Sequence, residues 1–212
     1  MNKKNIFLLT LLCSVITVSA QQIVGWNFSV RPYSKGNDTE IKANEADPNL
    51  EETILRRGAG LNNLKGFMNS FAAGFAKQPT SLEEARTTDT YMEFVVAPKS
   101  GYVASFKDLS FKVKCTNHGG VNYRWLYSKD KGKTFLSLGD NALAENSAEG
   151  IEQPKVELSV IGEINSKAKV IFRLYLWGAT KAPSEGSNFA IGRYPLQSAI
   201  PSLAISGTVK PQ

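Results

Sequence analysis

Two stretches of the chain, 122–128 and 170–177, carry Tyr, Trp and Arg side chains at alternate positions. A period of two places such side chains on one face of a β-strand. An aromatic ring can stack on the C–H face of a sugar, and a guanidinium group can donate hydrogen bonds to the sugar hydroxyls. The pattern therefore predicts a carbohydrate-binding face made of Trp125, Tyr127, Arg173, Tyr175 and Trp177.

The same rings have a second interpretation. Tryptophan buries most of its area in folded proteins, so these aromatics could instead fill the core or lie beneath a loop. Trp26, near the start of the chain, is interpreted as a core residue. Solvent exposure of the rings is the observation that separates the two interpretations.

Carboxylate side chains are the next candidates for chemistry. Glycoside hydrolysis uses two carboxyl groups at a fixed separation, and Glu93 is one candidate without an identifiable partner. The G-x-S-x-G and H-E-x-x-H motifs of hydrolases do not occur in the sequence. We predict no catalytic residue and no enzymatic activity, with a glycan-cleaving jelly-roll enzyme as an alternative.

The residues able to bind a metal are few or poorly spaced. The polar stretch 34–52 is rich in Asp and Glu and is predicted to be a surface loop; it lacks the spacing of a calcium-binding EF-hand. Cys115 lies in an alternating apolar run, which predicts a buried side chain, and with His118 alone it cannot form a zinc site. We therefore predict no metal and no cofactor, and keep calcium in the polar stretch as an alternative.

The stretch 128–135 reads Ser-Lys-Asp-Lys-Gly-Lys-Thr-Phe and resembles the Asp-box hairpin of secreted β-proteins. Asp130 can accept hydrogen bonds from the turn, and Gly132 can adopt a positive φ. The motif occurs once, so it predicts a structural hairpin and not a propeller.

The first twenty residues have the layout of a secretory signal peptide. Lys3 and Lys4 precede an apolar run, and Val18, Ser19 and Ala20 supply the small residues before a cleavage site. The apolar run is short for a membrane span, which needs about 20 residues. We predict an exported protein that is periplasmic, extracellular or on the cell surface, with residues 21–212 as a single domain.

Net charge and hydropathy narrow the range of partners. Loss of Lys3 and Lys4 would lower the formal net charge from +6 to +4. The remaining positive charge is mild and shows no dense basic block, so nucleic acid is not a predicted partner. No later segment is long and apolar enough to cross a membrane, and the sequence leaves the oligomeric state open.

The elements that must position these residues are mostly strands. Short alternating runs separated by Gly, Pro, Asn or Asp predict about eight to ten strands, as in a two-sheet antiparallel β-sandwich or jelly roll. Two short stretches, 61–76 and 81–86, have weak helical character, and Ser81 is a plausible N-cap. The predicted strands are 23–30, 53–55, 91–96, 109–115, 122–128, 134–136, 155–161, 168–177, 189–191 and 203–209.

Short motifs recur in a fixed order along the chain. They are Gly25-Trp26-Asn27-Phe28, Arg57-Gly58-Ala59-Gly60-Leu61, the aromatic stretch 67–75, Pro98-Lys99-Ser100-Gly101, Ser128 to Gly132, Phe172-Arg173-Leu174-Tyr175 and Ile205-Ser206-Gly207. This order resembles a group of secreted β-sandwich domains from Bacteroidetes, similar to galactose-binding-like and carbohydrate-binding-module jelly rolls. The acidic pair that such modules often carry before the last strand is replaced by Ser198-Ala199-Ile200-Pro201, which counts against a calcium site.

The residues and the resemblance together favour a non-catalytic carbohydrate-binding protein with a polysaccharide or other glycan as partner. A structural or protein-interaction module of the cell envelope is the first alternative. A jelly-roll enzyme that cleaves glycans is the second.

Overall fold

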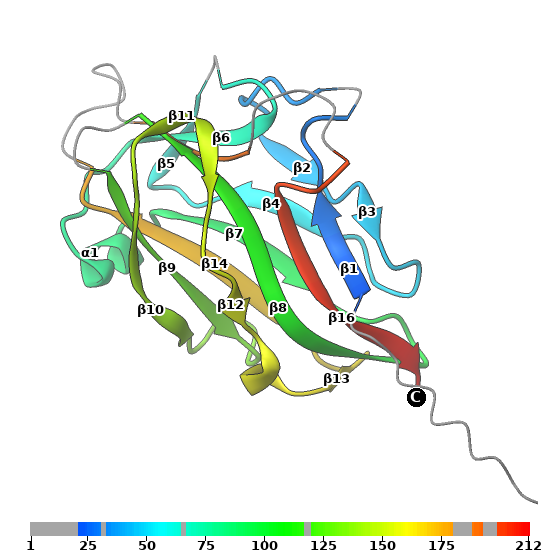
Figure 1. The fold of residues 1–212 in the computed structure, drawn as a ribbon. Coiled ribbons are helices and arrows are strands. Elements are labelled where there is room, and N and C mark those ends of the chain that lie inside the picture. Colours follow the sequence, from blue (N-terminus) through cyan, green and yellow to red (C-terminus); the bar gives the residue numbers. More distant parts are fainter. Residues whose placement is uncertain (1–20, 31–32, 65–66, 117–119, 180–187, 193–198) are drawn as a thin grey trace, which may run out of the picture.

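A computed structural model describes residues 21–30, 33–64, 67–116, 120–179, 188–192 and 199–212. The predicted signal peptide and His118 lie outside these ranges. The described chain folds into two antiparallel β-sheets packed face to face, so the predicted all-β sandwich is confirmed (Figure 1). The strands β6 (Ser70–Phe75), β7 (Tyr91–Val96), β8 (Tyr102–Cys115) and β9 (Val121–Ser128) alternate between the two sheets, a connectivity found in jelly rolls.

The first sheet is organised around β8, a strand of 14 residues. One edge of β8 pairs with β16 and then β15, and its other edge pairs with β13, β12 and β11. The order along the sheet is β3-β1-β16-β8-β15-β6-β5. The strands are β1 (Gln21–Trp26), β3 (Glu45–Ala46), β5 (Leu61–Asn63), β6 (Ser70–Phe75), β8 (Tyr102–Cys115), β11 (Ser147–Glu152), β12 (Val156–Glu157), β13 (Ile164–Asn165), β15 (Asn188–Gly192) and β16 (Leu203–Pro211).

The second sheet has the order β10-β9-β14-β7-β4-β2. Its central strand, β14, pairs with β7 on one side and with β9 on the other. The strands are β2 (Glu40–Lys42), β4 (Ile54–Arg57), β7 (Tyr91–Val96), β9 (Val121–Ser128), β10 (Leu136–Ala144) and β14 (Val170–Trp177).

An aromatic cluster fills the space between the sheets. The ring of Phe94 lies 4.9 Å from Trp26, 5.0 Å from Phe172 and 5.9 Å from Trp125, measured between centroids. These four side chains are no more than 1% exposed, which confirms Trp26 as a core residue. Cys115 is also buried, as predicted.

The helical content is small. Helix α1 (Leu82–Thr87) begins after Ser81, whose hydroxyl accepts a hydrogen bond from the Glu84 amide, so this predicted N-cap is confirmed. A single 3₁₀ turn, η1 (Ser159–Ile161), ends the region predicted as strand 155–161, where only β12 is extended. None of the helices in the described part of the chain is long and apolar enough to cross a membrane.

The helical expectation for 61–76 is wrong, because this stretch forms β5 and β6. All six residues of β6 are buried, so the strand shows no alternation between apolar and polar residues. A short apolar run of this kind cannot be assigned to helix or strand by periodicity alone.

The predicted loop 34–52 contains the two short strands β2 and β3, so a loop throughout is also wrong. Arg57 ties this stretch to the first sheet: its guanidinium donates to the carbonyls of Gly36, Asp38 and Ala72 and lies 3.7 Å from the ring centre of Phe71. Burial lowers the pKa of Arg57 to about 10.

The Asp-box stretch is a hairpin turn between β9 and β10, as predicted. Asp130 accepts hydrogen bonds from the Ser128 hydroxyl and from the amide and hydroxyl of Thr134. Lys131 and Gly132 have φ values of 63° and 85°, in the left-handed region that glycine favours. Hydrogen bonds from Thr134 and Ser128 hold the pKa of the Asp130 carboxyl well below its usual range.

We expect Phe94→Ala to lower the free energy of unfolding by about 3–5 kcal/mol, because truncation leaves a cavity at the centre of the aromatic cluster. Urea unfolding followed by circular dichroism measures the change. The matched control is Val160→Ala, at a side chain 68% exposed, which we expect to change stability by less than about 0.5 kcal/mol. Similar losses in the two variants would contradict the packing described here.

Asp130→Asn tests the hairpin through its pH dependence. A carboxyl whose pKa is lower in the folded state stabilises the fold above its unfolded pKa of about 3.9, and this contribution is lost as the pH falls. The wild-type protein should therefore be more stable than Asp130→Asn at neutral pH, and the difference should shrink below about pH 4. If the difference in urea midpoint between the wild-type protein and Asp130→Asn stays constant down to about pH 2, the Asp130 carboxylate does not stabilise the hairpin in this way.

Candidate functional site

The structure does not bring the five predicted ligand-binding residues onto one face. Strands β9 and β14 are neighbours, but Trp125 stands opposite Leu174 and Tyr127 opposite Phe172. Opposite residues of an antiparallel pair project to the same side. Trp125 and Tyr127 therefore point into the core, where they are 1% and 5% exposed, while Arg173, Tyr175 and Trp177 lie on the outer face.

The outer face is itself largely covered. Tyr175 and Trp177 are 2% and 6% exposed and pack with Ala85 of α1 and with Leu126. The helix lies across this end of β9 and β14 (Figure 1). The two rings therefore join the helix to the sheet and do not form an open platform for a sugar.

Arg173 is half-buried and fully engaged by its neighbours. Its Nε lies 2.6 Å from Glu93 Oε2, and its Nη1 donates to the Tyr175 hydroxyl at 3.1 Å. Its guanidinium carbon lies 4.0 Å from the ring centre of Tyr91 and 4.3 Å from that of Phe135. Glu93, a candidate catalytic carboxylate in the sequence, is thus one half of an ion pair on this face.

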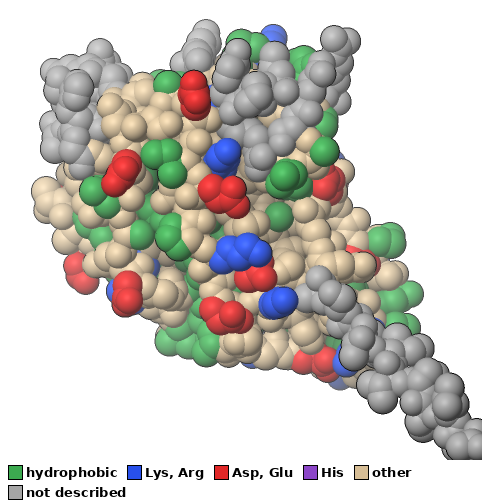
Figure 2. Space-filling model, in the orientation of Figure 1, with side chains coloured by type: hydrophobic (Ala, Val, Ile, Leu, Met, Phe, Trp, Pro, Cys, Tyr) green, Lys and Arg blue, Asp and Glu red, His purple; other side chains and the backbone are tan. Residues whose placement is uncertain are grey.

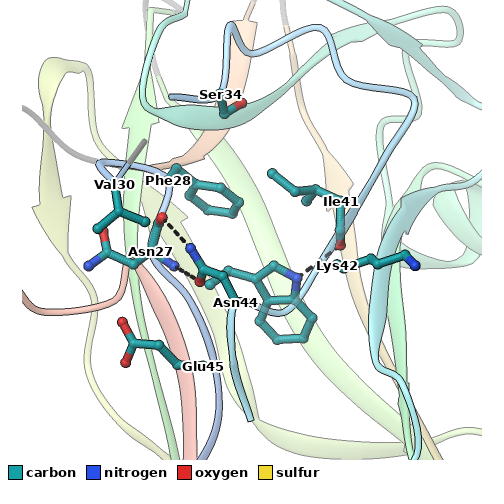
Figure 3. A pocket seen from close by; sticks show the side chains of 9 residues that line it. Asn27, Phe28, Val30, Ser34, Ile41, Lys42, Asn44 and Glu45 are labelled. Carbon is teal, nitrogen blue, oxygen red and sulfur yellow. Dashed lines mark hydrogen bonds between the residues drawn. The ribbon is translucent and has the colours of Figure 1, made fainter. Parts of the chain in front are cut away.

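Two clefts lie instead at opposite edges of the sandwich, where the sheets separate. The larger, of about 590 Å³, lies beside β2 and β3, and we call it the β2–β3 cleft. Figure 3 shows Phe28, Ile41 and Val30 above Asn27 and Asn44, with Lys42 and Glu45 on either side. Its lining residues are Trp26, Asn27, Phe28, Val30, Ser34, Ile41, Lys42, Asn44 and Glu45.

The polar groups of the β2–β3 cleft bind one another or the residues around them. The Asn44 side chain accepts a hydrogen bond from the Asn27 amide through Oδ1 and donates one to the Asn27 carbonyl through Nδ2. The Trp26 indole donates to the Ile41 carbonyl at 3.0 Å (Figure 3). Lys42 pairs with Glu52 at 2.6 Å, and Glu45 accepts from Gln22. These contacts close the edge of the sandwich, so the β2–β3 cleft is better explained as structure than as a binding site.

The second cleft lies between β10, at the edge of the second sheet, and β12, beside β8. Its volume is about 380 Å³, within the usual range for small ligands. We call it the bulge cleft. Its lining residues are Tyr123, Trp125, Leu138, Gly139, Asp140, Asn141, Ala142, Pro154, Lys155, Val156 and Glu157.

A β-bulge shapes one wall of the bulge cleft. The register of β10 shifts between Leu138 and Ala142, so that Gly139, Asp140 and Asn141 are not paired with residues of β9 in the ladder. Arg124 holds the bulge in place by donating to the Gly139 carbonyl at 2.7 Å and to Asn141 Oδ1 at 3.4 Å. Bulges often redirect side chains at binding sites, and this one brings Asp140 and Asn141 to the rim.

The floor of the bulge cleft is aromatic. The Tyr123 hydroxyl donates to Gln153 Oε1 at 2.8 Å, and burial raises the pKa of Tyr123 to about 12. The Trp125 indole nitrogen is buried and has no hydrogen-bond partner among the described residues. A buried donor without an acceptor is costly, so a partner supplied by a ligand would stabilise it.

The described residues contain no group of three or more His, Cys, Asp or Glu side chains placed to hold a metal ion. Two carboxylates, Asp140 and Glu157, line the bulge cleft with one cation, Lys155. The arrangement can therefore donate to and accept from a polar ligand at several points. Sequence reasoning singled out Trp125, but missed Asp140 and Asn141 because a bulge leaves no periodic pattern, and missed Lys155 because only the tertiary fold brings the start of β12 to this cleft.

Comparison with family models and with curated proteins finds no match. The resemblance to Bacteroidetes carbohydrate-binding-module domains therefore stays a prediction.

Trp177→Ala should lower the stability of the fold, because the Trp177 ring is packed between α1 and β9. We expect a loss of about 3 kcal/mol or more in the free energy of unfolding, typical of a buried Trp replaced by Ala. Urea unfolding measures it, with Lys133→Ala, at an exposed position, as the control. A variant as stable as the wild-type protein would mean that this face is open.

Proposed function

We propose that this chain is a non-catalytic carbohydrate-binding protein and that the bulge cleft holds the sugar. The observation that carries the proposal concerns Trp125, which lines the cleft and whose buried indole N–H has no acceptor among the residues that the structure describes. Two exposed polar side chains, Asp140 and Asn141, line the same cleft, and Asn141 is held only by a long hydrogen bond of 3.4 Å from Arg124.

The lining matches the two kinds of surface that a sugar presents. Ala142 and Val156, which are partly exposed, supply apolar contact for the C–H groups of a pyranose ring, above the nearly buried rings of Tyr123 and Trp125. Asp140 and Asn141 can accept or donate hydrogen bonds to its hydroxyls. Because the rim carries both signs of charge, a neutral saccharide fits it better than a strongly charged one.

The contrast between the two clefts supports this choice. The β2–β3 cleft is larger, but the polar side chains named above already have partners in the protein. In the bulge cleft, Asp140 makes no hydrogen bond or ion pair within the described part of the chain, and Lys155 lies 3.8 Å from Asp108 in a loose ion pair. Groups without strong partners are those available to a ligand.

Export fits this function, because an exported protein meets polysaccharides outside the cytoplasm. The proposal uses the signal-peptide pattern of residues 1–20, which lie outside the described residues. N-terminal sequencing of the protein from its native cells should find Gln21 as the first residue. Retention of Met1 would contradict export by this route.

Two carboxylates in one cleft are also the minimum set that glycoside hydrolysis uses. A glycosidase usually raises the pKa of its acid by placing that group in a desolvated environment. Asp140 and Glu157 are both exposed, and Glu157 accepts a hydrogen bond from the Ser159 amide. We therefore favour binding over cleavage, and release of reducing sugar from a bound polysaccharide would overturn that choice.

The binding test uses affinity gels containing laminarin, xylan, galactomannan or pullulan. We expect retardation by at least one of them. Asp140→Ala/Asn141→Ala should weaken that interaction by roughly tenfold or more, since each hydrogen bond contributes about 1 kcal/mol.

Glu145→Ala/Asn146→Ala is the matched control, because it removes the same charge and amide from exposed positions just after β10. It should bind like the wild-type protein. Equal losses in both double variants, or no retardation on any of the four gels, would count against the bulge cleft as the site.

A further inference from the structure

A third cavity lies at one end of the second sheet. Strands β7 and β9 end there and β14 begins there, because β14 is antiparallel to both. The cavity has a volume of about 230 Å³. Four lysines surround it, Lys129 and Lys131 from the Asp-box hairpin and Lys167 and Lys169 from the segment before β14. We call this the lysine cleft.

Small side chains make the lysine cleft concave. Ala97 follows β7 directly, and Ala168 lies between two of the lysines. The Lys129 ammonium group donates to the Ile161 carbonyl at 2.7 Å, which fixes one wall. The backbone, the small alanine side chains and the anchored Lys129 therefore form the concavity. The other three lysines only surround it.

The positive charge of the lysine cleft is poorly neutralised. None of its lining residues is acidic, and Lys131, Lys167 and Lys169 form no ion pair with the described residues. The adjacent carboxylate of Asp130 is held within the hairpin by Ser128 and Thr134. Like charges gathered around a hollow focus an attractive potential for anions.

The broad face formed by β8 and β16 differs from this cleft. Acidic and basic side chains are intermixed across it, with apolar ones scattered between them (Figure 2). Ion pairs on or beside this face include Lys155 with Asp108 and Lys210 with Glu163. The net positive charge is therefore not spread evenly, and the lysine cleft is a place where it collects.

We propose that the lysine cleft is a second binding site, which takes the sulfate or carboxylate groups of an acidic polysaccharide. Lysine is a compact point charge on a flexible stem, and four of them can surround one tetrahedral or planar anion. The small volume suits a single charged substituent with the sugar chain running past the opening. The site shares no residue with the bulge cleft and does not depend on it.

Two other polyanions fit less well. Binding of single-stranded nucleic acid usually adds aromatic rings that stack on bases, and the lining contains neither an aromatic residue nor an arginine. Binding to an anionic membrane surface is strengthened by large apolar side chains that insert into it, and the only apolar lining residues are alanines. A charged group on a polysaccharide needs neither feature.

The test measures binding of the purified protein to dextran sulfate and to polygalacturonate at low ionic strength, with unsulfated dextran as the neutral reference. We expect the protein to bind one or both polyanions. We expect no binding of unsulfated dextran at the lysine cleft. Lys131→Gln/Lys169→Gln should weaken that binding roughly tenfold or more, because it removes half of the charge around the cleft.

Lys35→Gln/Lys77→Gln is the matched control, since it removes the same net charge at exposed lysines outside the lining. It should change affinity by less than about twofold. Equal losses in the two variants would show general attraction by net charge and would overturn the proposal, as would failure of both polyanions to bind.

Two further arms test the class of partner. A DNA oligonucleotide and phosphatidylserine vesicles should bind more weakly than the better of the two polysaccharides. Tighter binding to either one, lost in Lys131→Gln/Lys169→Gln, would reassign the cleft to that partner. This variant should be retained on a neutral-glycan gel as strongly as the wild-type protein. A wrong assignment of the lysine cleft can therefore be distinguished from a wrong assignment of the bulge cleft.

Discussion

Ring contacts between the two layers set the spacing of the two sheets: Phe94 meets Trp26, Phe172 meets Phe106, and Trp125 meets Phe111. The β2–β3 cleft and the bulge cleft lie on either side of this cluster, beside the edge strands β2 and β10 of the second sheet. Trp125 belongs to the cluster and also lines the bulge cleft, so one side chain joins the core to the proposed site. The floor of that site is therefore packed as part of the core, and a preformed floor limits the entropy lost when a ligand binds.

Much of the fold follows from the alternating pattern of the sequence. The bounds of β7 are those predicted, and β9 and β14 differ from prediction by one or two residues, because each is a run rich in β-branched and aromatic residues. The pattern fails for β6, which is buried throughout, and for the short strands β2 and β3, which are largely polar. In these strands, tertiary position and not local periodicity decides the structure.

The predicted ligand face could not be resolved from sequence for a related physical reason. Both faces of β9 and β14 carry large apolar side chains, since one meets the other sheet and the other meets α1. Alternation shows which residues share a face within one strand, but the register between strands decides which faces coincide. Trp125 and Trp177 belong to different faces for this reason, and the bulge that shapes the cleft has no periodic signature at all.

The central claim is that a saccharide reaches Trp125 through the bulge cleft. The chain has three tryptophans, Trp26, Trp125 and Trp177, so a ¹⁵N–¹H spectrum should resolve three assignable indole signals. Titration with the polysaccharide that is retained most strongly on the gels should shift the Trp125 indole signal and leave the other two nearly unchanged. Movement of the Trp26 or Trp177 signal with Trp125 unaffected would contradict the account.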